Sequence, residues 1–135
     1  MSETGASDEL IEVVFAALDH GIGSVSISGG PLIPFTLTED GAGRHLARFV
    51  AETLEESLIQ ARTQVAASDA DRVAIAHDGY LTVEGERSDA IFVEAQDRGS
   101  PSCLVFAQRY RPGGRLRKLS RIGNPALTGT GDPLF

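Results

Sequence analysis

The spacing of apolar residues changes near residue 73, and this change constrains the fold more than any other feature of the sequence. Before residue 73, two stretches have apolar residues every three or four positions, as on one face of a helix. After it, apolar and polar residues alternate in short runs, as in strands that bury one face. Helices followed by a series of antiparallel strands indicate the α+β class.

Two helices are predicted in the first half of the chain. Ser7 is suited to cap the first, which has apolar residues at helical spacing from Leu10 onward and ends at Gly21. Thr38 is expected to cap a second helix over about residues 42–67, which would be the longest regular element. Its apolar stripe consists of Leu46, Phe49, Val50, Leu54, Leu58, Ala61 and Val65. We therefore expect a short N-terminal helix and a long amphipathic helix.

A hairpin is predicted between these helices. Residues 24–28 alternate between polar and apolar side chains, and Gly29-Gly30 is a common hairpin turn. The second strand, within 31–37, contains Pro31 and Pro34, which cannot donate backbone hydrogen bonds. We expect it to be an edge strand or partly irregular.

The Asp78-Gly79 pair predicts a two-residue turn between strands at 73–77 and 80–84. That register places apolar residues on both faces of the sheet. Either both faces are covered, in which case a second subunit would supply the missing layer, or the turn is longer.

Two further strands are expected at 91–96 and 103–111, and a last one is possible within 115–122. Residues 1–6 and about 124–135 are expected to be flexible or irregular ends. The whole prediction is a single α+β domain over 1–135, in which an N-terminal hairpin and a C-terminal meander form an antiparallel sheet. This sheet packs against the long amphipathic helix and the shorter N-terminal helix.

Charge and composition exclude several classes of function. The net charge of −7 disfavours nucleic acid as the main partner, because phosphate binding requires a cationic surface. One cysteine allows no internal disulfide and no zinc site with two thiolates. The first nine residues are polar and acidic, unlike a secretion signal, and no run approaches the ~20 apolar residues that cross a bilayer. We expect a cytoplasmic protein without a membrane association, a metal or another cofactor.

The basic residues cluster near the C-terminus. Residues 1–97 hold eighteen acidic and five basic side chains, whereas residues 98–135 hold one acidic and seven basic side chains. The candidate contacts to an anion or a partner are Arg109, Tyr110, Arg111, Arg115 and Arg117. Forked hydrogen bonds from these guanidinium groups would suit a phosphate or a carboxylate. The favoured interpretation is that Arg109 and Arg111 lie on the face of the sheet that carries Glu84 and Glu86, and pair with those carboxylates.

No convincing catalytic set is visible, and no catalytic residue is assigned. The three histidines do not follow metal-ligand spacing, and Cys103 has no base near it in the sequence. The glycine-rich segments match neither a phosphate loop nor a dinucleotide-binding motif. We expect these residues to have structural roles, and we expect the protein not to be an enzyme.

Apolar residues on the outer face of the predicted sheet indicate self-association. Ile75, Tyr80 and Phe92 are the candidates for a partner surface. A two-fold interface requires only one self-complementary patch, so we expect a homodimer.

The order helix, hairpin, long helix and meander resembles roadblock-type dimerisation modules. An acidic domain of this size with an open sheet is similar to small secretion-type and related peptide-binding chaperones. Both resemblances imply a non-enzymatic protein whose sheet or helix face binds another polypeptide. The first hypothesis is therefore a cytoplasmic, homodimeric adaptor or peptide-binding chaperone. The alternative is a small-molecule or anion-binding protein, or an enzyme, that uses the arginine-rich strand at 109–117.

Overall fold

The computed structural model describes residues 6–28, 31–114 and 117–135. These residues form two helices and a six-stranded antiparallel sheet, which confirms the α+β class. In chain order the elements are α1 (Asp8–Ser28), β1 (Phe35–Asp40), β2 (Gly43–Arg48), α2 (Leu54–Ala66), β3 (Arg72–Val83), β4 (Glu86–Asp97), β5 (Cys103–Arg111) and β6 (Ser120–Gly131).

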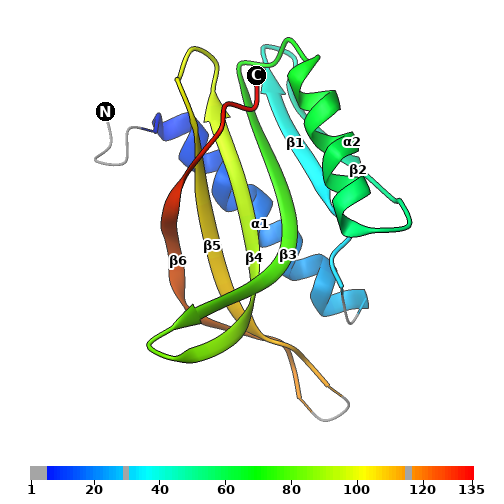
Figure 1. Cartoon of the computed structure of the whole chain (residues 1–135), viewed down its shortest axis with the longest axis vertical. Coiled ribbons are helices and arrows are strands. Elements are labelled where there is room, and N and C mark those ends of the chain that lie inside the picture. Colours follow the sequence, from blue (N-terminus) through cyan, green and yellow to red (C-terminus); the bar gives the residue numbers. More distant parts are fainter. Residues whose placement is uncertain (1–5, 29–30, 115–116) are drawn as a thin grey trace.

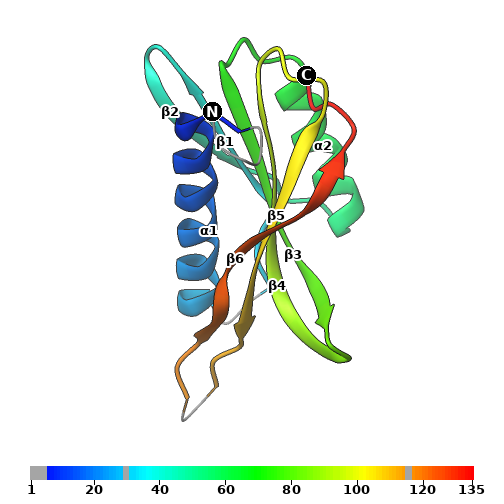
Figure 2. The ribbon, with the colours of Figure 1, turned by 90° about the vertical axis from the view of Figure 1, so that its left-hand side faces the viewer.

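The sheet forms the middle of three layers. Its strand order is β2-β1-β3-β4-β5-β6, so β2 and β6 are the edges. Figure 2 shows α1 on one face and α2 on the other, with α2 displaced toward β1 and β2. The long strands β3, β4 and β5 therefore contribute to two separate cores, while part of the α2 side of β4, β5 and β6 has no helix over it (Figure 1).

The larger core lies between α1 and the sheet. Residues of α1 at helical spacing, including Leu10, Val14 and Leu18, are almost fully buried. They face alternate strand residues such as Ile91 and Val93. Burial of aliphatic surface on this scale is the main contribution to the stability of such a fold.

The smaller core lies under α2. Ala61 and Val65 of the helix pack with Val73, Ile75 and Cys103 of the strands. Leu134, close to the C-terminus, belongs to the same cluster. Both faces of the sheet are thus partly covered within one chain, which accounts for the apolar residues on both faces without a second subunit.

The first helix is longer than expected. Leu10 N donates to Ser7 Oγ at 3.0 Å, as predicted for the helix cap, but α1 continues through Gly21 to Ser28. A Cβ on Gly21 would lie 3.1 Å from Ile91 Cγ2, so this glycine allows close packing of the helix on β4 rather than ending it. The predicted strand at 24–28 is therefore wrong, and its Gly29-Gly30 turn lies outside the described residues.

The predicted long helix over 42–67 is also wrong in its first half. Residues 43–48 form β2, which pairs with β1 across a tight turn at Gly41-Ala42. Gly43 adopts φ 122°, a conformation that side chains rarely tolerate. The helix begins only after Thr53, whose side chain accepts from Glu56 N at 3.1 Å. The N-terminal hairpin is thus β1–β2, and α2, with 13 residues, is shorter than α1, with 21.

Asp78 and Gly79 do not form a turn. They lie in the middle of β3, which pairs along its whole length with β4. The turn is at Glu84-Gly85, where φ is 53° and 81°. A turn with positive φ could form at Asp78-Gly79 or at Glu84-Gly85. The turn at Glu84-Gly85 makes β3 and β4 longer, so that their pairing buries more residues in both cores.

The C-terminal tail is more regular than expected. Most of 124–135 belongs to β6, which pairs with β5 and shifts register twice. After the strand, Leu134 N donates to the buried Gln96 side chain at 2.6 Å. The irregular end predicted from Gly, Pro and Thr is therefore wrong for this segment. The residues before Ala6 lie outside the described part of the chain.

By length and composition alone, α1 could cross a membrane. Its residues Asp8–Ile27 have a mean hydropathy of 1.5, which differs from the expectation that no segment approaches this limit. One side of the helix packs on the sheet, and a helix in the core of a soluble protein has the same composition. The length and hydropathy of α1 are therefore only weak evidence for a membrane span.

Candidate functional site

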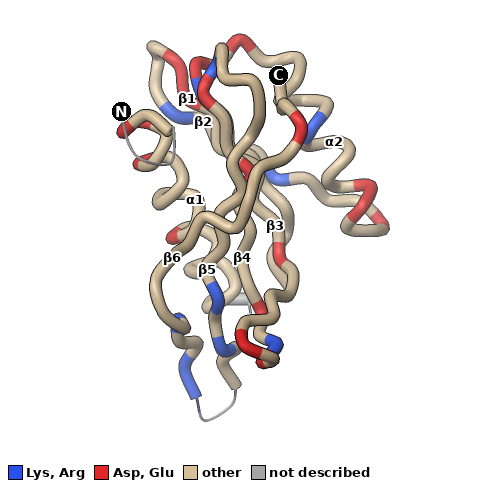
Figure 3. Tube along the Cα trace, turned by 60° about the vertical axis from the view of Figure 1, so that its left-hand side comes forward, with Lys and Arg blue, Asp and Glu red and all other residues tan. Residues whose placement is uncertain are grey.

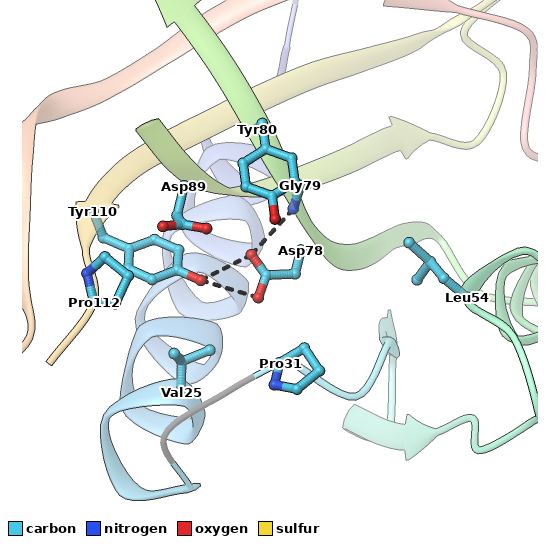
Figure 4. A pocket seen from close by; sticks show the side chains of 9 residues that line it. All are labelled: Val25, Pro31, Leu54, Asp78, Gly79, Tyr80, Asp89, Tyr110 and Pro112. Carbon is cyan, nitrogen blue, oxygen red and sulfur yellow. Dashed lines mark hydrogen bonds between the residues drawn. The ribbon is translucent and has the colours of Figure 1, made fainter. Parts of the chain in front are cut away.

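A hollow of about 440 Å³ opens where the C-terminal end of α1 meets β3, β4 and β5. Figure 4 shows side chains from these elements around it. It is lined by Val25, Pro31, Leu54, Asp78, Gly79, Tyr80, Asp89, Tyr110 and Pro112. Apolar walls with a few polar groups are typical of binding sites.

Asp78 and Tyr110 form the centre of this hollow. The Tyr110 hydroxyl donates to the Asp78 carboxylate, 2.9 Å from Oδ1 and 3.0 Å from Oδ2 (Figure 4). Gly79 N donates to the same carboxylate at 3.1 Å. Three strands meet here, because Asp78 pairs with β4, and Asp89 of β4 pairs with Tyr110 of β5.

Asp78 also fixes the segment that follows α1. Leu32 N donates to Asp78 Oδ2 at 3.2 Å, and Phe49 N donates to Pro34 O at 2.9 Å. The segment 31–34 is therefore held to β3 at one end and to the chain after β2 at the other. This gives the hollow a defined wall.

Tyr110 is held in its neutral form. Burial, followed by the hydrogen bond to Asp78, raises the pKa of the Tyr110 hydroxyl well above its usual range. The charge of Asp89 acts in the same direction. The phenol is suited to donate a hydrogen bond and not to act as a base near neutral pH.

A second hollow of about 220 Å³ adjoins the first on the other side of segment 31–34. The two share Pro31, Leu54 and Asp78, and we call them together the Asp78 groove. The second hollow is lined by Pro31, Leu32, Ile33, Pro34, Phe49, Val50, Ala51, Glu52, Thr53, Leu54, Ser57 and Asp78. The groove thus runs from the start of α2 to the end of α1.

Large apolar side chains of the Asp78 groove remain in contact with water. Leu54 is 47% exposed, Val50 75%, Ile33 46% and Tyr80 61%. They come from three separate segments, 31–34, 49–54 and β3, that only the fold brings together. Exposed apolar side chains gathered at a hollow mark a surface for association more often than scattered ones do.

The structure separates the predicted anion-binding residues instead of gathering them. Tyr110 points to the α1 side, so its neighbours Arg109 and Arg111 point to the opposite face. Val93 pairs with Phe106, but Arg109 and Arg111 form no ion pair with the described acidic residues. Figure 3 shows Lys and Arg where β5 ends and β6 begins, and Asp and Glu at the β3–β4 turn.

Of the two remaining arginines of that set, the structure describes only Arg117. Arg117 is exposed and forms an isolated bridge with Gly114. Arg115 lies outside the described residues. Arg117 and Lys118 line a separate hollow of about 660 Å³, which shares Val25 and Pro112 with the Asp78 groove.

Of the three predicted partner-surface residues, only one lies on the surface of this groove. Tyr80 lines it, and the Arg87 guanidinium lies 4.0 Å from the centre of its ring. Ile75 is fully buried under α2, so its assignment to a partner surface is wrong. Phe92 is half-buried and stacks on His77 at 5.5 Å.

The remaining candidates have local structural partners. His20 packs edge-on against Phe35, His45 lies 3.4 Å from Asp40, and burial lowers the pKa of His77. Burial raises the pKa of the Cys103 thiol, so it is not activated as a nucleophile. Among the described residues, no three His, Cys, Asp or Glu side chains come together as metal ligands do.

Sequence reasoning missed most of the groove. The sequence pattern predicts a turn at Asp78, and it places Leu54 and Val50 on the buried stripe of a long helix. A useful signal was present at Thr53-Leu54-Glu55-Glu56, a capping-box pattern that indicates a helix start at Leu54. No sequence pattern indicates that Asp89 belongs to the groove, because only the pairing of β3, β4 and β5 places it beside Tyr110.

Comparison with known proteins does not extend these observations. No family model matches the sequence, and the searches of curated proteins and of solved structures found no significant match. The function is therefore argued from the groove itself.

Proposed function

We propose that the protein is a non-enzymatic interaction protein that binds an apolar segment of another polypeptide in the Asp78 groove. The observation that carries this proposal is the group of exposed apolar side chains around two adjoining hollows. Burying such side chains contributes about 25 cal/mol for each Å² removed from water. An elongated groove between two helix ends suits a chain segment better than it suits a compact metabolite.

The polar groups of the groove support binding and not catalysis. Asp78 accepts from Tyr110, Leu32 and Gly79, and these bonds hold the walls together. The phenol of Tyr110 remains protonated, because its pKa is raised. A reaction of the acid–base type would require a group whose pKa lies near the working pH.

The test is a peptide array. Random peptides of about twelve residues, a length that fills typical peptide-binding grooves, are immobilised and probed with the tagged full-length protein. We expect the bound peptides to be enriched in Leu, Ile, Val and Phe. Failure of the native protein to bind any peptide above the blank would contradict the proposal.

Two substitutions on the same helix make the array specific. Leu54→Asp places a charge in the groove at the first position of α2, where an acidic residue suits the helix dipole. Ile59→Asp places the same charge on an exposed part of α2 that does not line the groove. We expect at least a tenfold loss of signal for Leu54→Asp and little change for Ile59→Asp. Equal binding by Leu54→Asp and the native protein would also contradict the proposal.

A further inference from the structure

We propose that the polypeptide segment bound in the Asp78 groove carries a Lys or Arg side chain, whose cationic group lies beside Asp89 and Asp78. This inference rests on the proposed function and names the chemistry of the partner. It is carried by the charges of the groove, by the unpaired carboxylate of Asp89, and by the apolar walls around both carboxylates.

The lining of the Asp78 groove is acidic without a compensating base. Its described lining residues include three carboxylates, from Asp78, Asp89 and Glu52, and no Lys, Arg or His. Arg87 packs on the Tyr80 ring and offsets part of this charge from one side. The groove retains a negative field, which attracts cations and repels anions.

Asp89 is the carboxylate with capacity for a ligand. It is half-buried, and within the described residues it has neither a hydrogen bond nor an ion pair. Figure 4 shows it beside the Tyr110 ring, on the same side of the sheet as Asp78. A partly desolvated carboxylate is more stable with a cationic donor than without one.

Among the described residues, Asp78 accepts from neutral donors only. Its three partners are the Tyr110 hydroxyl and the backbone N–H groups of Leu32 and Gly79, so its charge is solvated by dipoles and not neutralised. The charges of both aspartates help to raise the pKa of Tyr110, which agrees with a negative field at this point. A cation near Asp89 would also be attracted by Asp78.

The walls fit the shape of a long basic side chain. Lys and Arg combine an aliphatic stem with a charged end, and they bury the stem against apolar surface. Val25, Pro31 and Leu54 supply that surface beside the two carboxylates. An anionic ligand, as considered for the arginine-rich strand, would be repelled here.

The test uses the same peptide array with the native protein and two charge variants. Asp89→Asn removes the unpaired carboxylate of the groove. Asp69→Asn is the matched control, because Asp69 is exposed beyond the opposite end of α2 and the substitution changes the net charge equally. We expect Lys and Arg to be enriched at least twofold in peptides bound by the native protein and by Asp69→Asn, but not in those bound by Asp89→Asn.

A second measurement changes the peptide, so that the effect of the lysine is compared within each protein and does not depend on how well Asp89→Asn folds. The lysine-containing peptide that binds best is compared, by fluorescence polarisation, with a derivative that has norleucine in place of lysine. For the native protein we expect the derivative to bind about fivefold more weakly, the effect of losing a partly exposed ion pair. For Asp89→Asn we expect the two peptides to bind equally, as in a double-mutant cycle.

The possible outcomes separate the two proposals. Aliphatic enrichment without Lys or Arg enrichment would overturn this inference and leave the proposed function standing. Enrichment of Lys and Arg in the peptides bound by Asp89→Asn, to the same degree as in those bound by the native protein, would also overturn it. The attraction would then come from the net charge of the protein. If no peptide binds the native protein, both proposals are wrong.

Discussion

Asp97 and Asp78 lie near opposite ends of α1, on the same sheet, but their surroundings differ. At the N-terminal end, Asp97 accepts from Ser7 N at 3.2 Å and from Ser7 Oγ at 2.8 Å, and its carboxylate lies 3.4 Å from the Arg72 guanidinium. At the C-terminal end, within the part of the chain that the structure describes, Asp78 accepts only from neutral donors and the nearby Asp89 has no partner.

This difference separates a structural carboxylate from a candidate binding carboxylate. The Arg72 guanidinium also lies 2.7 Å from the Glu39 carboxylate. The charges of Asp97 and Glu39 are therefore paired with a base of the same chain. The carboxylates at the C-terminal end are not balanced by the groove lining. A protein retains such an unpaired charge at a cost in stability, which binding of a cationic partner would offset.

The largest expected effect compares two valines of α1. Val13 is fully buried in the core, whereas Val25 lines the Asp78 groove. We expect Val13→Ala to lower the free energy of unfolding by about 2–3 kcal/mol, from lost burial and the cavity left behind. Val25→Ala should cost about 1 kcal/mol, because its site already adjoins an open hollow. Urea denaturation measures both, and equal losses would mean that the two ends of α1 are equally well packed.

The next effect compares the two aspartates directly. We expect Asp97→Asn to lower the free energy of unfolding by about 1–2 kcal/mol, because it removes the charge that pairs with Arg72. Asp78→Asn should cost about 1 kcal/mol, because the amide oxygen still accepts from Tyr110 and the repulsion from Asp89 is relieved, while the new NH2 group can no longer accept from one of the two backbone N–H groups.

For peptide binding we expect Asp78→Asn to have the larger effect and Asp97→Asn the smaller, the reverse of their order for stability. Asp78→Asn should weaken binding of peptides that contain Lys or Arg, while Asp97→Asn should leave it unchanged. Urea denaturation and the peptide array together provide the measurement. A variant at Asp97 that loses peptide binding while it remains folded would remove the distinction between the two ends.

The smallest effect is a pH dependence. The pKa of Tyr110 is raised in the folded protein, so the unfolded chain ionises first, above the usual tyrosine value of about 10. The contribution of Tyr110 to stability is therefore fully present below about pH 10 and is lost as the pH rises toward the higher folded value.

Two tyrosine variants isolate this contribution. Tyr110→Phe should lower the free energy of unfolding by about 1 kcal/mol at pH 8 and reduce its fall between about pH 8 and pH 11. Tyr80→Phe is the control, because Tyr80 is 61% exposed. Urea denaturation across this pH range tests the prediction. An unchanged slope in Tyr110→Phe would show that the hydroxyl is not protected from ionisation.

Local patterns in the sequence predicted the elements whose signals have no strong competitor. The cap at Ser7 and the apolar stripe that follows it predicted the start of α1. Alternation predicted β5, in which Phe106 and Tyr110 lie on the same face.

Two of the misassigned elements involved competing local signals. Asp78-Gly79 and Glu84-Gly85 both allow a turn, and a local turn preference is small beside the burial that long strands gain by pairing. The apolar residues from Leu46 onward fit a helical stripe, but Gly41 and Gly43 favour a hairpin before it. The capping box at Thr53 gives the true start of the helix.

The sequence by itself therefore determined the α+β class, the acidic balance and the buried face of each well-patterned element, because these depend on composition and on periods of a few residues. The tertiary structure decided which carboxylates are paired. Asp78, Asp89 and Tyr110 are far apart in the chain and meet only because β3, β4 and β5 pair in one register. A shift of that register by one residue would turn these side chains to the other face of the sheet, and no local pattern specifies it.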